Sequence, residues 1–156
     1  MKRAPSYKGL LPASAKASRI ASAGSTKRDT APELLLRRTL WSQGLRYKVD
    51  VGLLPGRPDV VIGSARLVIF CDGDFWHGRN LKRRLAKLAA GHNAPYWVSK
   101  IKTNVARDRR VERQLTKSGW SFLRFWESEL RANPAVAARA VMKAVRAKRA
   151  RSSVRT

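Results

Sequence analysis

Hydrophobic positions recur with helical spacing after Thr30, and this pattern predicts the first helix of the chain. Thr30 can cap the helix, Pro32 suits its first turn, and Glu33 stands three residues after the cap. Gly44 follows the last apolar position and ends the helix. The same spacing predicts two further helices, over residues 94–117 and from residue 134 onwards.

Short apolar runs predict strands in four places, at residues 47–51, 58–62, 67–71 and 120–126. Gly63-Ser64-Ala65 forms a compact turn between the second run and the third, so these two strands should form a hairpin. The basic segment 79–91 shows neither pattern clearly. The order α-β-β-β-α-β-α predicts an α/β domain in which helices pack on both faces of a mixed sheet.

Charge is the unusual part of the composition. The 156 residues include 34 Lys and Arg against 10 Asp and Glu, which gives a formal net charge of +24. A surface this basic binds polyanions, of which nucleic acid is the commonest. An anionic membrane is the alternative, but no apolar stretch approaches the length of a membrane span and no secretory signal is apparent. We therefore expect a soluble protein that binds nucleic acid and does not contact a membrane.

The charge is unevenly distributed, and its distribution suggests three parts. Residues 1–27 have the composition of a flexible basic arm, residues 28–145 form the predicted domain, and residues 146–156 form a second basic tail. Cys71 is the single cysteine, which excludes an intramolecular disulfide and a multi-cysteine zinc site. A lone cysteine fits a reducing cytoplasm, where we expect the protein to lie with the nucleoid.

Acidic residues stand at the open end of the predicted hairpin, where its first strand begins and its second strand ends. Asp59 precedes Val60-Val61-Ile62, and Asp72 and Asp74 follow the run that ends at Cys71. Carboxylates that converge in so basic a protein suggest a divalent metal brought to phosphate, which is the chemistry of a nuclease. Asp59 is the strongest candidate for a Mg²⁺ ligand, although its position also suits a turn residue. Asp74 is more simply explained as a turn residue.

Three sequence blocks carry a resemblance to a known family. They are Pro55-Gly56-Arg57-Pro58-Asp59, Asp72-Gly73-Asp74-Phe75-Trp76-His77, and the segment from Trp120 to Glu127. In this order they resemble the very-short-patch-repair (Vsr-type) DNA endonucleases over about residues 26–130. The resemblance implies a restriction-endonuclease-like three-layer fold of the PD-(D/E)xK superfamily, with a central mixed β-sheet flanked by helices.

The resemblance also implies roles for individual residues. Asp59 and the backbone carbonyl of Cys71 would hold Mg²⁺, with Asp72 beside them. His77 would be the general base, since a neutral imidazole accepts a proton near pH 7. Asp72-Gly73-Asp74 lacks the lysine of the PD-(D/E)xK pattern, a departure that Vsr-type enzymes share.

Two further acids have alternative explanations. Glu33 is either a capping-box acid or, as in the family, a residue near the metal. Asp108 shares a helix face with Lys100 and Asn104, which is either a solvated charged face or, by the resemblance, a face directed at the metal through water.

Aromatic residues and cations complete the predicted DNA contacts. Phe75 and Trp76 would pack in a core or, as the resemblance implies, insert into the DNA stack beside a mismatched pair. The further candidates for DNA binding are Arg57, Lys100 and Asn104.

Two departures from the family pattern bear on specificity. Asp74, Arg79, Leu81 and Ser128 stand in the neighbourhoods where zinc-binding relatives have cysteines and histidines, so no zinc is expected. The family's arm methionine is also absent from residues 18–26. Both departures weaken the inference of mismatch specificity and leave the metal-site residues unaffected.

The function that the sequence favours is a Mg²⁺-dependent DNA endonuclease that nicks near T·G mismatches in very short patch repair. One alternative is a nuclease of the same fold without mismatch preference, active in phage defence or on mobile elements. The other is a DNA-binding protein without turnover. We expect a monomer whose partners are double-stranded DNA and, as further candidates, repair proteins.

Overall fold

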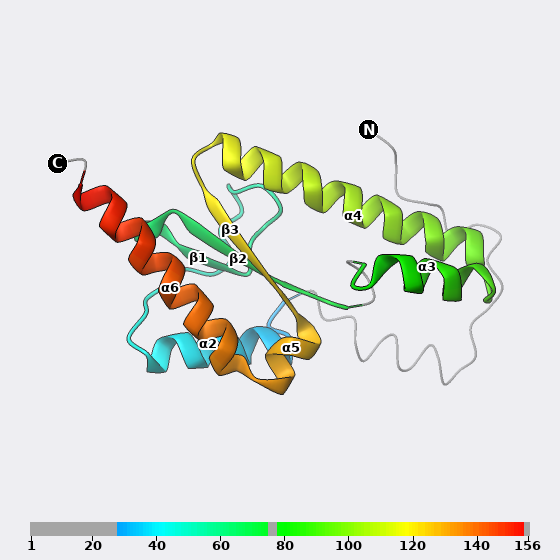
Figure 1. Cartoon of the computed structure of the whole chain (residues 1–156), viewed down its shortest axis with the longest axis horizontal. Helices are drawn as coiled ribbons and strands as arrows, with labels where there is room; N and C mark the ends of the chain where they lie inside the picture. Colours follow the sequence, from blue (N-terminus) through cyan, green and yellow to red (C-terminus); the bar gives the residue numbers. More distant parts are fainter. Residues whose placement is uncertain (1–27, 75–77, 155–156) are drawn as a thin grey trace.

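The computed structural model describes residues 28–74 and 78–154, and the elements of this part form three layers (Figure 1). In chain order the elements are α2 (Ala31–Ser42), β1 (Val60–Ile62), the 3₁₀ turn η1 (Gly63–Ala65), β2 (Leu67–Asp72), α3 (Leu81–Ala89), α4 (Ala94–Lys117), β3 (Ser121–Trp126), α5 (Glu127–Ala132) and α6 (Pro134–Ser153).

A mixed sheet of order β1-β2-β3 forms the middle layer. β1 pairs with β2 in antiparallel register, with Val60 opposite Ile69, which confirms the predicted hairpin. β3 pairs with β2 in parallel, from Leu67 opposite Ser121 to Asp72 opposite Trp126. Because β2 is the central strand, both of its edges are hydrogen-bonded to neighbouring strands.

Helices cover the two faces of the sheet from opposite sides. Figure 1 shows α2, α5 and α6 on one face and α4 on the other, with α3 alongside α4. In β2, Ile69 belongs to the core beneath α2 and α6, whereas Val68 and Phe70 belong to a second core with Val111 of α4. This alternation is the period of two that a strand buried on both faces requires. The predicted three-layer α/β fold is confirmed.

One local prediction is wrong, and two helices were not predicted. The predicted strand at 47–51 is wrong: a single bridge joins Lys48 to Val61, and Asp50 then adopts a left-handed φ of 57° that turns the chain away. The segment 79–91, for which no structure was predicted, contains the helix α3. α5 follows β3 directly and was not predicted.

The C-terminal helix is longer than the predicted domain boundary implies. α6 continues through Ser153, so most of the basic tail at 146–156 is helical and continuous with the domain. Among the described residues, no helix has the length and apolar character needed to span a membrane.

Candidate active site

Asp59 lies at the open end of the β1–β2 hairpin, where its side chain joins the two strands. Its backbone N–H donates to the carbonyl of Ile69 (3.0 Å), and its Oδ2 accepts from the N–H of Cys71 (2.6 Å). The N–H and C=O of one strand residue point to the same side, so the Cys71 carbonyl also faces the end of the hairpin where Asp59 lies. The carboxylate and carbonyl predicted to hold the metal therefore come from adjacent strand ends.

The loop before Asp59 is fixed against α4. Gly56 has a φ of 77°, and a Cβ at this position would lie 2.5 Å from Cγ1 of Val111 and 3.2 Å from the ring of Phe70. Both the backbone conformation and the close approach require glycine. Pro58 is buried immediately before Asp59. Packing against the helix thus sets the position from which the Asp59 side chain projects.

Two buried acids flank Asp59 from different layers. Glu33 of α2 is 4% exposed and Asp72 at the end of β2 is 5% exposed. The pKa of Asp59 is raised from 3.8 to about 7, chiefly by burial and in addition by the negative charges of Glu33 and Asp72, against the lowering effect of the Cys71 N–H bond. A carboxylate in this setting is easily charged only when a cation is near.

Glu33 is held by contacts at the start of α2. Its carboxylate accepts from the N–H of Asp29 (3.0 Å) and from Arg37 one turn later (3.1 Å). Thr30 accepts from the N–H of Glu33 (3.5 Å), as the predicted cap requires. Both interpretations of Glu33 thus have a structural basis, since the residue takes part in capping contacts and acts on the charge of Asp59.

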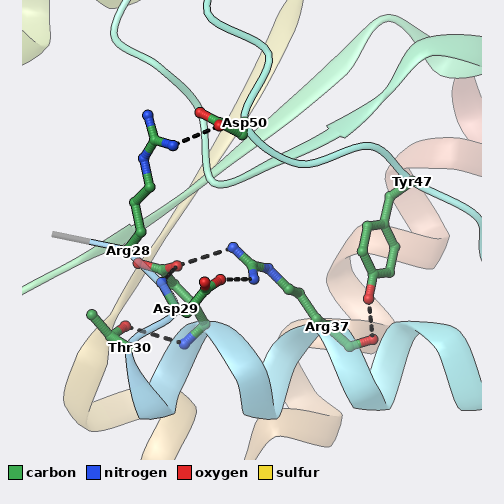
Figure 2. A network of polar contacts seen from close by, with 7 residues as sticks. Arg28, Asp29, Thr30, Arg37, Tyr47 and Asp50 are labelled. Carbon is green, nitrogen blue, oxygen red and sulfur yellow. Dashed lines mark hydrogen bonds and ion pairs between the residues drawn. The ribbon is translucent and has the colours of Figure 1, made fainter. Parts of the chain in front are cut away.

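Arg37 also extends this network away from the helix start. It pairs with Asp29, and its backbone carbonyl accepts from the hydroxyl of Tyr47 (3.0 Å), as Figure 2 shows. Arg28 pairs with Asp50 in the loop that leads toward β1. These contacts connect the helix that carries Glu33 to the loop before the hairpin.

Asp72 is bound on the α4 side of the sheet by Arg124 of β3. One guanidinium nitrogen lies 2.7 Å from Oδ2 of Asp72, another lies 2.6 Å from Glu112, and a third lies 3.8 Å from Asp108. The guanidinium stacks on Phe70 at 4.3 Å from the ring centroid. Burial lowers the pKa of Arg124, but these carboxylates more than offset this and raise it, so Arg124 stays charged. Asp108 is therefore connected to Asp72 through Arg124.

Asp59 is the one acid that has no ion pair to another described residue. Nine of the ten carboxylates in the chain lie within 4.0 Å of an arginine nitrogen, whereas Asp59 pairs with no cation among the described residues. The arginines that serve the others are Arg28, Arg37, Arg79, Arg124 and Arg131. A partly buried carboxylate without a cation is costly in a protein of net charge +24, where cations are abundant.

The donor set around Asp59 fits Mg²⁺. No three His, Cys, Asp or Glu side chains within residues 28–74 and 78–154 form a metal-binding group. Mg²⁺ does not need such a group, because it commonly binds one or two carboxylates and completes its shell with water and substrate phosphate oxygens. Burial raises the pKa of the Cys71 thiol, so its side chain stays neutral and only its carbonyl is available as a ligand.

The remaining predicted residues have different positions. Phe75, Trp76 and His77 lie outside the described residues. Lys100 donates to the hydroxyl of Tyr96 (3.2 Å), and Asn104 is half-buried on α4, one turn before Asp108.

Arg57 and Asp74 lie on either side of the hairpin end. Arg57 is exposed, with a left-handed φ of 49°. Asp74 accepts from the N–H of Ser128 (3.2 Å) and lies 3.5 Å from Arg79, which also donates to the Ser128 hydroxyl. These polar contacts join the end of β2 to α5 and agree with a structural role for Asp74.

Two arginines in this site were not predicted from the sequence. Arg37 follows Glu33 by four residues, a spacing that favours an ion pair on a helix and was available as a signal. Arg124 interrupts an apolar strand 52 residues after its partner Asp72, and no local pattern links the two.

Comparison with known proteins is consistent with this geometry. A family model described as DNA mismatch endonuclease Vsr matches residues 13–83. The type II nicking enzyme V.NmeDIP of Neisseria meningitidis serogroup C is 36% identical over 129 residues, which cover 83% of this chain and 86% of that enzyme. The type II nicking enzyme V.HpaIIP of Haemophilus parainfluenzae is 37% identical, with 79% and 86% covered. The DNA mismatch endonuclease Vsr of Escherichia coli K12 is 44% identical, with 67% and 65% covered.

The fold and the carboxylate at its strand end define the class of protein, a restriction-endonuclease-like DNA endonuclease. Within that class the chain belongs to the Vsr family, as the three sequence blocks predicted.

Proposed function

We propose that this protein is a Mg²⁺-dependent endonuclease that nicks one strand of duplex DNA beside a T·G mismatch, in very short patch repair. The observation that carries the proposal is Asp59, the carboxylate without an ion pair among the described residues. Its charge is disfavoured by burial and by two neighbouring acids, and a divalent cation would relieve that cost.

Asp59 and the Cys71 carbonyl would hold the ion, with Asp72 beside them. When bound, Mg²⁺ supplies neutralisation of phosphate charge and lowers the pKa of water at the site. Asp72 is fixed by Arg124, so it contributes a carboxylate whose position changes little. Glu33 and Asp108 would orient water through hydrogen bonds.

His77 would take the proton from the attacking water, because a neutral imidazole is a competent base near pH 7. Arg57, Lys100 and Asn104 would hold the DNA backbone near the site. Phe75 and Trp76 would enter the base stack, where a weakly paired T·G step costs least to unstack.

Relatives support nicking of DNA, and the mismatch preference is the finer part of the proposal. Some are named for mismatch cleavage and others as type II nicking enzymes. A nuclease of the same fold without mismatch preference is the second candidate. The absent arm methionine and the absent zinc ligands favour it, since both would support the aromatic wedge in relatives.

The test uses end-labelled duplexes that differ only in one base pair, matched or T·G, incubated with Mg²⁺ or with EDTA at one salt concentration. We expect a single-strand nick that requires Mg²⁺ and forms faster on the T·G duplex. Asp59→Ala should bind DNA without cutting it, and it serves as the control for a contaminating nuclease. Equal rates on both duplexes would favour the second candidate, and no cleavage of any duplex would contradict endonuclease function.

A further inference from the structure

α6 carries several basic side chains and no acidic ones. Between Pro134 and Ser153 the chain has no Asp or Glu, and all ten acids of the sequence lie between Asp29 and Glu129. No cation of α6 ion-pairs with a carboxylate in the described part of the chain. These cations are Arg139, Lys143, Arg146, Lys148, Arg149 and Arg151.

Three of the cations share one exposed face of the helix. Arg139, Lys143 and Arg146 follow one another by four and three residues, so they form a row about 10 Å long at 1.5 Å of rise per residue. With Gln43 at the end of α2 and Met142, they line an open pocket of about 620 Å³. We call Arg139, Lys143 and Arg146 the α6 basic face.

The α6 basic face lies at the far end of α2 from the acidic cluster. Gln43 caps the C-terminus of α2, whereas Glu33 lies in the first turn of the same helix. Ten residues of helix separate them, which is about 15 Å along the axis. Duplex DNA advances 3.4 Å per base pair, so this separation corresponds to about four base pairs.

We propose that the α6 basic face binds the phosphates of the duplex flank on one side of the nick, at least about four base pairs from it. Only the position of the nick rests on the proposed function. The face suits a polyanion because its cations are exposed and lack competing carboxylates, and Arg binds phosphate in a bidentate manner. A protein partner would need an apolar anchor at the centre of the interface, and the pocket lining offers only Met142.

The experiment compares two charge-matched triple variants of the full chain. The first carries Arg139→Gln, Lys143→Gln and Arg146→Gln. The control carries Arg110→Gln, Arg113→Gln and Lys117→Gln, which removes the same charge from an exposed face of α4. Binding is measured by fluorescence anisotropy in EDTA, on T·G duplexes whose flanks are lengthened one side at a time, and circular dichroism checks that both variants fold.

Wild-type affinity should rise when one flank passes about four base pairs, and the α6 variant should lose that rise while the control keeps it. The slope of log affinity against log salt should flatten by about 2 to 3 in the α6 variant, at about 0.9 per phosphate lost. Equal losses in both variants would overturn the proposal, because net charge alone would then explain them. Two other results would also overturn the proposal. One is a wild-type affinity that does not depend on flank length, and the other is an α6 variant that loses only the binding of a second duplex. Absence of nicking would bear on the proposed function alone, because binding is measured without cleavage.

Discussion

Replacement of Asp59 by asparagine should stabilise the metal-free protein. Asparagine keeps the size of the side chain and an oxygen that can accept from the N–H of Cys71, but it removes the charge. The folded protein disfavours that charge because of burial and the nearby Glu33 and Asp72. The variant therefore isolates the electrostatic cost of a site built to receive a cation.

The sign and size follow from the pKa of Asp59, which is 3.8 in the unfolded chain and about 7 in the folded protein. Below pH 3.8 both states hold the proton, and wild type and variant should be equally stable with respect to this group. Between 3.8 and about 7 the unfolded chain loses the proton first, so wild-type stability falls as pH rises. Above pH 7 the difference is complete and amounts to at most about 4 kcal/mol in favour of the variant.

The assay is urea unfolding followed by tryptophan fluorescence, from about pH 4 to about pH 8, in EDTA and in Mg²⁺. In EDTA the stability difference should grow with pH. Mg²⁺ should raise the wild-type midpoint near pH 8 and leave the variant unchanged, because a ligand stabilises only the state that binds it. Equal stabilities near pH 8 in EDTA would refute the electrostatic reasoning, and equal stabilisation of both proteins by Mg²⁺ would place the ion elsewhere.

Four further predictions concern residues around the site. His77→Ala should slow single-turnover nicking by about 10²–10⁴-fold, and an unchanged rate would show that His77 is not the base. Arg124→Leu should lower the free energy of unfolding by about 3 kcal/mol or more, because it removes one partner of a buried ion pair with Asp72. Arg131→Leu, which breaks an exposed pair, should cost less than about 1 kcal/mol, and similar losses in the two variants would argue against the importance of the buried pair. Trp76→Ala should slow nicking of T·G duplex more than of matched duplex, and a uniform loss would contradict intercalation at the mismatch. Elemental analysis after dialysis should find no stoichiometric zinc. About one zinc per chain would contradict the inference that this protein lacks the zinc ligands of its zinc-binding relatives.

Elements with local signals were predictable from the sequence. Thr30 caps α2 as expected, and the limits of α4 agree with the predicted 94–117. α5 has only six residues, too few for a periodic pattern. The alternation at 47–51 suggested a strand, but alternation cannot reveal that Asp50 turns the chain before a second bridge forms.

The candidate site was predictable to the extent that its residues follow one another in the chain. Asp59 and Cys71 meet because a hairpin brings their strand ends together, and hairpins are local. Arg124 reaches Asp72 through a parallel pairing of strands, with α4 between them in the chain. Because such contacts depend on how whole layers pack, a single sequence does not reveal them.

The close approach of Gly56 to Val111 has a consequence for motion. Exposed loops usually open on their own and exchange their amide hydrogens rapidly. Here the backbone before Asp59 rests on a side chain from the interior of a 24-residue helix, so the loop cannot swing inward, and its packing is shared with a buried core. The amides of Asp59 and Cys71, which hydrogen-bond across this hairpin end, should therefore exchange at rates set by opening of the α4 layer. The rigidity of the proposed metal-binding turn is then a property of α4, and substitutions at Val111 should loosen the turn without touching any residue within it.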